Sequence, residues 1–376
     1  MKKNEFFLAE KLEKRGNLRR KLFPQGDFID FSSNDYLGIA HNRSLEKEFL
    51  QYVAEKENWF GSTGSRLLTG NNEHIESLEF FLAEYFRGEA ALSFGSGFSA
   101  NSSLLAAVAQ KGDCILYDEL IHASLKEGYR LSFAERNSFK HNDLEDLEKK
   151  ITAAKKTSKE IFVVTESVFS MDGDSPDLPT LLTLCEKHSA LLILDEAHAT
   201  GVFGENGGGL AVECGLEERI FARIYTFGKA GGCVGACLVG SALLRDFMIN
   251  FGIGFIYTTA ISPLIALQIE FALKFMAKNP ELREKLHENI FFFKEKARDA
   301  GLTLCAESRS GIQMLACDST EEAKEISTHL RENGFDVRPI LPPTAKSPRL
   351  RVCLHAHNGI FEIENLIRTL KIALKK

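Results

Sequence analysis

The sequence lacks the cysteine spacing of a metal site. Its eight cysteines are scattered over 376 residues, and Cys233 and Cys237, which are four apart, lie in an apolar run. Scattered cysteines of this kind are typical of reduced, structural thiols in a cytoplasmic protein. We therefore expect a cytoplasmic location and no metal centre.

Long hydrophobic runs and an excess of basic charge are also missing. The apolar stretch 251–256 is far shorter than the roughly 20 residues of a membrane-spanning helix, and Pro263 soon follows it. The first residues are charged, unlike the apolar segment of a signal peptide. The net charge of -6 does not favour a nucleic-acid surface. We expect neither a membrane span nor a nucleic-acid partner.

Hydrophobic residues make up 44% of the chain, enough for a sizeable core. Short apolar runs alternate with helical patterns between residues 90 and 240, which predicts an α/β fold with a mainly parallel sheet. The expected strands are 90–94, 114–117, 161–165, 191–195 and 221–227. Helices are expected over 5–22, 143–156, 263–276 and 280–300.

The pattern changes in the last hundred residues. Short strands at 311–315, 335–338 and 350–354 stand among helices, which indicates a smaller α+β lobe. We expect three parts: an N-terminal segment (1–45), a large α/β domain (46–275) and a small C-terminal domain (276–376).

The stretch 191–235 contains two residues whose side chains are suited to binding a cofactor. Asp195 ends an apolar strand, and Lys229 follows the next strand in a glycine-rich turn. Pyridoxal phosphate needs a lysine for its covalent attachment and an anionic partner for its ring nitrogen. Asp195 and Lys229 fit those two roles, although a strand-end aspartate and a loop lysine also occur together in unrelated proteins.

A second motif, Gly95-Ser96-Gly97-Phe98-Ser99-Ala100, turns from a strand into a helix. Exposed backbone N–H groups and the helix dipole make such a turn suitable for a phosphate. The same letters fit the dinucleotide fingerprint G-x-G-x-x-G/A, and Asp118 follows Gly97 by 21 residues. From these residues alone, an NAD-dependent dehydrogenase remains an alternative.

A third motif match, to the helicases, is excluded. Residues 195–198 spell the helicase motif DEAH, but an ATPase also needs G-x-x-x-x-G-K-[ST]. Gly228-Lys229 is followed by Ala230, so the phosphate-binding loop is absent.

Ten motifs in order carry a family resemblance from about Phe28 to the C-terminus. They are FSSNDYLG (31–38), GSTGSRLLTG (61–70), SGFSAN (96–101), HAS (122–124), HND (141–143), ESVFSMDGD (166–174), DEAHATGVFG (195–204), TFGK (226–229), YTTAISP (257–263) and RLRVCL (349–354). In this order they resemble the α-oxoamine synthase family, pyridoxal-phosphate transferases of fold type I. The resemblance favours pyridoxal phosphate over a dinucleotide at the glycine turn.

The resemblance implies a role for each matching residue. Lys229 would hold the cofactor and move the α-proton of the substrate. Asp195 would pair with the ring nitrogen, His198 with the ring hydroxyl, and His122 would stack on the ring. The other implied cofactor contacts are Ser96, Gly97, Phe98 and Thr226 at the phosphate, Ser170 near the ring hydroxyl, and Thr258 or Thr259 from a second subunit.

The resemblance also implies an acyltransferase reaction. In it, L-alanine condenses with a pimeloyl thioester, carried by CoA or acyl-carrier protein, and loses carbon dioxide in a step of biotin synthesis. Arg351 would bind the amino-acid carboxylate, for which a planar bidentate donor is suited, and Asn34 matches a position that serves the neighbouring subunit's site. Arg19, with Arg15 and Arg20, would meet the acyl carboxylate or the carrier phosphates, or form a solvated helix face.

Two kinds of alternative stay within this family: another enzyme activity, or a non-catalytic subunit. Glycine C-acetyltransferase, serine palmitoyltransferase and 5-aminolaevulinate synthase share the motifs, although FSSNDYLG and GSTGSRLLTG favour the alanine and pimeloyl reaction. A non-catalytic partner subunit would lack the lysine, so Lys229 argues against one. A homodimer with shared active sites is expected.

The sequence departs from the family pattern in three places. Residues 20–28 form a shorter segment than in many relatives, Gly231 stands where phenylalanine is common, and residues 355–357 read His-Ala-His. These departures bear on the acyl substrate and not on the cofactor.

Overall fold

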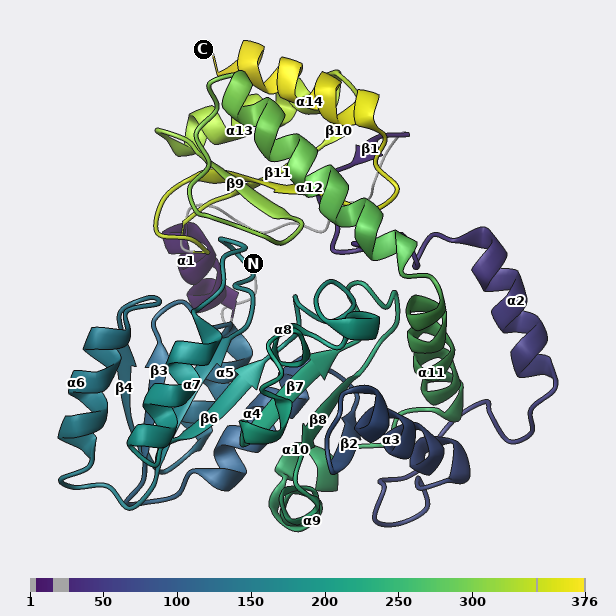
Figure 1. Ribbon diagram of the computed structural model, residues 1–376, viewed down its shortest axis with the longest axis vertical. Helices are drawn as coiled ribbons and strands as arrows, with labels where there is room; N and C mark the ends of the chain where they lie inside the picture. The colour runs from purple at the N-terminus through teal and green to yellow at the C-terminus, as the bar shows by residue number, and fades with distance from the viewer. Residues whose placement is uncertain (1–4, 16–26, 343, 375–376) are drawn as a thin grey trace.

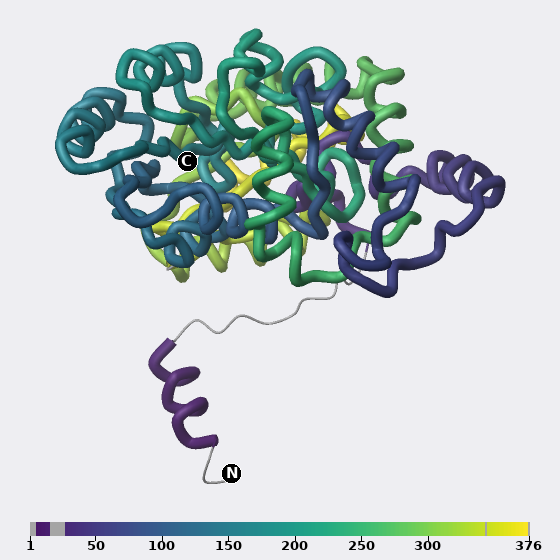
Figure 2. Tube along the Cα trace, turned by 90° about the horizontal axis from the view of Figure 1, so that it is seen from below, coloured from purple at the N-terminus to yellow at the C-terminus, as the bar shows by residue number. Residues whose placement is uncertain are grey.

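The computed structural model describes residues 5–15, 27–342 and 344–374 (Figure 1). A large α/β part surrounds a seven-stranded sheet, and a smaller part holds the C-terminal strands and helices. The first helix, α1 (Phe6–Arg15), buries none of its residues and lies apart from the other elements (Figure 2). The predicted helix over 5–22 is confirmed for this range, and its remainder lies outside the described residues.

The central sheet has the strand order β2-β8-β7-β6-β5-β3-β4. The strands from β7 to β4 run parallel, and β8 is antiparallel to β7 and β2. This confirms the predicted α/β class with a mainly parallel sheet. The strands are β2 (Ala90–Phe94), β3 (Cys114–Asp118), β4 (Glu135–Phe139), β5 (Ile161–Glu166), β6 (Leu191–Asp195), β7 (Ala222–Thr226) and β8 (Ala236–Gly240).

Helices cover both faces of this sheet, so that its strands bury alternate side chains in two different cores. Along β6, Ile193 packs in a core with residues of α4 (Gly97–Val108) and α5 (Ala123–Leu131). Leu192 and Leu194 point to a larger core, which includes residues of α3 (Glu73–Tyr85), α7 (Leu178–Lys187) and α11 (Pro263–Lys278). Burial on both faces explains the continuous apolar run of β6, and each such side chain stabilises the fold by about 1.5–3 kcal/mol.

The other helices of the large part vary in length from one turn to more than four. They are α2 (Arg43–Ala54), α3 (Glu73–Tyr85), α6 (Leu144–Ala154), α7 (Leu178–Lys187), α8 (Leu210–Glu213), α9 (Ala242–Phe251), α10 (Ile253–Ile256) and α11 (Pro263–Lys278). Among the described helices, none has both the length and the apolar character that crossing a membrane requires.

The C-terminal part contains an antiparallel sheet in the order β11-β12-β9. The first described strand, β1 (Ile29–Asp30), joins this part by pairing in parallel with β10 (Phe335–Asp336). The remaining elements are β9 (Ile312–Ala316), β11 (Arg338–Ile340), β12 (Arg349–Cys353), α12 (Glu281–Asp299), α13 (Thr320–Glu332) and α14 (Ile360–Ala373). The three-part division of the chain stays a prediction.

One expectation about strands was wrong in detail, and strand β4 was missed. The single strand expected over 335–338 is divided into β10 and β11, because β10 pairs with β1 whereas β11 pairs with β12. Strand β4 was not predicted, because its sequence Glu-Arg-Asn-Ser-Phe is polar. As an edge strand it keeps its first residues exposed, so no apolar run marks it.

His141 ties the loop after β5 to the end of β3. Its Nδ1 lies 3.0 Å from Asp118, and its Nε2 lies 2.8 Å from Asp174 in that loop. Burial alone would lower the pKa of His141, but hydrogen bonds and charge from both carboxylates outweigh it and raise the pKa to about 10. The ring also packs edge-on against Phe169. This contact orders the loop that carries Ser170.

This arrangement predicts a pH-dependent contribution of His141 to stability. Because the pKa is raised from an unfolded value near 6.5, the contribution is complete below that pH and is lost as the pH rises through about 10. We expect His141→Gln to lower the free energy of unfolding by a few kcal/mol at neutral pH and by much less near pH 10. Urea denaturation at several pH values measures this.

The control for that experiment is His188→Gln. His188 pairs with Glu148, which is itself exposed, so its removal should change stability by well under 1 kcal/mol. A loss of stability in His141→Gln that is the same at every pH would contradict the argument.

Candidate active site

A cavity of about 660 Å³ opens at the carboxyl ends of β5, β6 and β7. Ligands of open parallel sheets bind at this edge, because the loops after the strands diverge there. The cavity brings together eleven of the residues predicted for the site. These are Asn34, Ser96, Gly97, Phe98, His122, Ser170, Asp195, His198, Thr226, Lys229 and Arg351.

Asp195 is the buried anion of this cavity. It ends β6, and its side chain is held by two donors: the backbone N–H of Ala197 at 2.9 Å to Oδ1, and Asn101 Nδ2 at 2.7 Å to Oδ2. Only 4% of the residue is exposed. These bonds hold the carboxylate in one orientation, as a partner for a cationic ring nitrogen requires.

Lys229 lies in the turn after β7. Its Nζ donates to Thr226 Oγ1 at 3.2 Å. Burial lowers the pKa of Lys229, the carboxyls of Asp195 and Glu166 oppose that effect, and the cation of Arg351 adds to it. A lysine with a lowered pKa gives up its proton more readily, which suits both covalent attachment and proton transfer.

The anion site predicted at the glycine turn is formed by the first turn of α4. Ser96 caps this helix and accepts the N–H of Ser99 at 3.2 Å. A Cβ at Gly97 would lie 2.5 Å from Thr226 Cγ2, so only glycine lets the helix start approach β7 this closely. The helix dipole and the free N–H groups of the first turn favour a phosphate here.

His198 and Tyr36 form a buried pair at the same cavity. Tyr36 Oη lies 2.8 Å from His198 Nδ1. Burial puts the pKa of His198 well below its usual value, and the charges of Lys229 and Arg351 lower it further. Burial raises the pKa of the Tyr36 hydroxyl. Both side chains are therefore neutral at physiological pH, and each offers hydrogen bonds and no charge.

Arg351 brings a buried positive charge into the cavity from β12. Its guanidinium donates to three neutral acceptors: Ser170 O at 3.1 Å, Asn34 Oδ1 at 3.0 Å and Cys353 Sγ at 2.8 Å. Among the described residues, no carboxylate forms an ion pair with it, although only 8% of the residue is exposed. A buried cation without a counter-ion is costly, so this site is suited to an anionic ligand.

Sequence reasoning missed Glu166. This residue ends β5 in register with Asp195, and its Oε1 accepts the backbone N–H of His122 at 2.5 Å. Burial raises the pKa of Glu166 well above its usual value, and the charge of Asp195 adds to that effect. A second acid at the end of a neighbouring buried strand was a signal that was present in the sequence.

Two of the predicted residues that the structure describes are not brought to the cavity. Thr258 and Thr259 are exposed and do not line it. Arg19 lies outside the described residues. The roles assigned to all of the site residues stay predictions.

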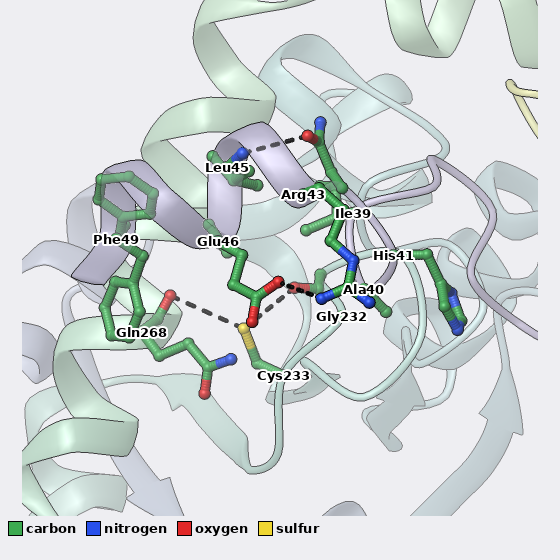
Figure 3. A pocket seen from close by; sticks show the side chains of 14 residues that line it. Ile39, Ala40, His41, Arg43, Leu45, Glu46, Phe49, Gly232, Cys233 and Gln268 are labelled. Atoms are coloured by element: carbon green, nitrogen blue, oxygen red, sulfur yellow. Dashed lines mark hydrogen bonds and ion pairs between the residues drawn. The ribbon is translucent and has the colours of Figure 1, made fainter. Parts of the chain in front are cut away.

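A second pocket, of about 430 Å³, lies beside residues 231–233 and the start of α2 (Figure 3). Gly231 and Gly232 contribute no side chains to it, and Cys233 lines both this pocket and the main cavity. Arg43 and Glu46 form an ion pair at its edge. Neither Lys229 nor Asp195 reaches this pocket, so it is not the catalytic cavity.

Comparisons with known proteins agree with this geometry. The family model described as "Aminotransferase class I and II" matches residues 26–370. The 8-amino-7-oxononanoate synthase of Emericella nidulans is 36% identical, over 98% of this chain and 95% of that protein.

Two solved structures are also similar. The 8-amino-7-oxononanoate synthase of Francisella tularensis has a TM-score of 0.79 at 28% identity, and covers 93% of this chain and 98% of its own. A serine palmitoyltransferase with pyridoxal phosphate has a TM-score of 0.88 at 25% identity, and covers 99% of this chain and 97% of its own.

The chain belongs to the aminotransferase class I and II family and, within it, to the α-oxoamine synthases, which are acyl-transferring enzymes of fold type I. Its cofactor is pyridoxal phosphate. The cavity fits that group, because one lysine, one buried carboxylate and one helix N-terminus line the same space. This family and cofactor exclude the NAD-dependent dehydrogenase, and the phosphate role of the glycine turn stays a prediction.

Proposed function

We propose that the enzyme condenses L-alanine with a pimeloyl thioester to give 8-amino-7-oxononanoate, carbon dioxide and the free thiol of CoA or acyl-carrier protein. This is a step of biotin synthesis. The observation that carries the amino-acid half is the buried Arg351, which has no acidic partner among the described residues and shares its cavity with Lys229 and Asp195. The pimeloyl half is supported by the names of the relatives.

The side chains of the cavity have three roles in this proposal: substrate binding, proton transfer and orientation of the cofactor. Arg351 binds the alanine carboxylate through its planar fork of donors. Lys229, with its lowered pKa, takes the proton from the α-carbon and later returns one. When bound, pyridoxal phosphate supplies the electron sink that stabilises the α-carbanion and, after acylation, the loss of carbon dioxide.

The remaining groups keep the cofactor in one orientation. Asp195 would pair with a cationic ring nitrogen, and the neutral His198 and Tyr36 pair would serve the ring hydroxyl without adding charge. Ser96, Gly97 and Thr226 would hold the phosphate at the start of α4. The ring of His122 would cover the cofactor.

A matched substrate panel tests the reaction. Alanine, glycine and serine are each combined with pimeloyl, acetyl, succinyl and palmitoyl thioesters, and products and released thiol are measured. We expect kcat/KM for alanine with the pimeloyl thioester to exceed every other pair by at least 10-fold, since a poorly fitting side chain costs about 1–3 kcal/mol. A preference for glycine with acetyl-CoA, or for serine with palmitoyl-CoA, would refute the substrate assignment and leave the cofactor chemistry intact.

We also propose that the enzyme acts as a homodimer with shared active sites. Large apolar side chains stand exposed in the single chain, with Phe60 86%, Leu68 81% and Tyr257 82% accessible. Tyr257 directly precedes Thr258 and Thr259, and Leu68 lies in the GSTGSRLLTG motif. An exposed apolar surface of this kind is typical of a two-fold interface.

Hybrid dimers test the sharing of sites. Lys229→Ala has no attachment lysine, and the double variant Thr258→Ala/Thr259→Ala lacks the hydroxyls that a partner would contribute. Mixed and re-equilibrated, the two inactive proteins should regain up to about a quarter of wild-type activity, because one site of each hybrid is intact. Absence of any recovery, or a fully active monomer in sedimentation, would contradict the proposal.

A further inference from the structure

The residues Asn101 and Ser124 belong to the motifs SGFSAN and HAS, and the reaction described above gives neither of them a role. Both are almost completely buried, with 2% and 1% of their surfaces exposed. Asn101 lies on α4 and Ser124 on α5, the helices that flank the cavity. Together they connect the carboxylate of Asp195 to the ring of His122.

The connection is a continuous chain of hydrogen bonds. Asn101 Nδ2 donates to Asp195 Oδ2 at 2.7 Å and to Ser124 Oγ at 2.9 Å. Ser124 Oγ lies 2.8 Å from His122 Nδ1, and the backbone N–H of Ser124 donates to the same nitrogen at 3.2 Å.

The direction of each bond in this chain is fixed. An ionised carboxylate only accepts, so the amide of Asn101 must turn its nitrogen toward Asp195. This orientation is unfavourable for the other amide atom, because Asn101 Oδ1 is buried without a hydrogen-bond partner. Ser124 Oγ accepts from Asn101 and therefore has its own proton available for His122.

The ring nitrogen at the end of the chain faces one group that can only donate, the backbone N–H of Ser124, and one hydroxyl that has a proton to donate. A backbone N–H cannot accept a hydrogen bond, so a proton on His122 Nδ1 would oppose it directly. Protonated histidine carries a proton on both nitrogens, and this conflict excludes it as well. The Nε2 edge is unaffected, because the ring is exposed and lines the cavity.

We infer that Asn101 and Ser124 are positioning residues that hold His122 in its neutral tautomer, with the proton on Nε2. His122 then covers the cofactor without placing a second positive charge beside Lys229. It also presents one N–H donor to the contents of the cavity. This inference depends on the hydrogen-bond geometry and not on the identity of the acyl substrate.

The charges around His122 agree with a neutral ring. Partial burial lowers its pKa, the carboxylate of Asp195 at the end of β6 opposes that effect, and the cations of Lys229 and Lys126 lower the pKa further. Two further titratable neighbours are Glu166 at the end of β5, which receives the backbone N–H of His122, and His198.

Nitrogen NMR of the full-length enzyme labelled with ¹⁵N-histidine tests the inference, both with and without pyridoxal phosphate. The His122 resonances are identified from the spectrum of His122→Gln. We expect the wild-type ring to show the Nε2–H tautomer at neutral pH and a titration midpoint below the usual histidine value of about 6.5. An Nδ1–H tautomer, or a charged ring at neutral pH, would overturn the inference without any variant.

Three variants identify the source of the effect. Ser124→Ala removes the hydroxyl donor, and we expect the midpoint to rise by about half to one pH unit and the second tautomer to appear. Ser124→Thr keeps a hydroxyl and should restore the wild-type spectrum. Ser167→Ala, which removes another buried hydroxyl next to Asp195, is the control. A Ser124→Ala spectrum identical to the wild type would refute the role of the chain.

Discussion

Replacing Lys229 by alanine is expected to lower the rate of condensation by about 10²–10⁴-fold or more, the contribution of one group that transfers a proton in the transition state. The same change removes the covalent attachment of pyridoxal phosphate. Lys229 is the lysine that lines the cavity, and burial lowers its pKa. Single-turnover kinetics with alanine, together with the visible absorbance of the purified protein, measure both effects.

The matched control is Lys187→Ala. Lys187 lies on α7, pairs with Glu148 and is exposed, so its loss should leave the rate and the absorbance unchanged. A Lys229→Ala enzyme with near-wild-type turnover, or with a cofactor still covalently bound, would contradict the assignment.

Replacing Arg351 by lysine is expected to raise the KM for alanine by about 10- to 150-fold, with a smaller change in kcat. Charge-assisted hydrogen bonds contribute about 1.5–3 kcal/mol, and each 1.4 kcal/mol is a factor of ten in affinity. Lysine keeps the charge but cannot form the bidentate contact with a carboxylate. An effect on KM alone identifies a group that binds the substrate equally in the ground and transition states.

The control for this experiment is Arg338→Lys. Arg338 stands opposite Arg351 in the β11–β12 pair, but its guanidinium is bound to Asp336. We expect no change in KM for this variant. If Arg351→Lys keeps the wild-type KM, or if both variants raise it equally, Arg351 does not bind the amino-acid carboxylate.

Much of the sheet was predictable from the sequence, because strands that are buried on both faces have continuous apolar runs. The strand predicted at 191–195 coincides with β6, and its terminal acid lies where the cofactor site was expected. Strand β4 has no continuous apolar run, because an edge strand can be polar. The pairing of β1 with β10 joins segments about 300 residues apart, and no local pattern predicts it.

The site also has one part that was predictable from the sequence and one part that was not. Ordered motifs identified eleven residues that the fold brings to one cavity, because those motifs occupy the ends of neighbouring strands and helices. The chain from Asp195 through Asn101 and Ser124 to His122 was not predictable, since it depends on the relative position of α4 and α5. Thr258 and Thr259 are exposed in the single chain, and only the proposed homodimer would place them at a partner's site.

Reduction with borohydride followed by peptide mass spectrometry tests the central claim most directly. The reagent makes the link between pyridoxal phosphate and its lysine permanent, so the position of the label identifies the residue that held the cofactor. We expect one label per chain, on the peptide that contains Lys229. A label on any other lysine, or a protein with cofactor bound and no label, would contradict it.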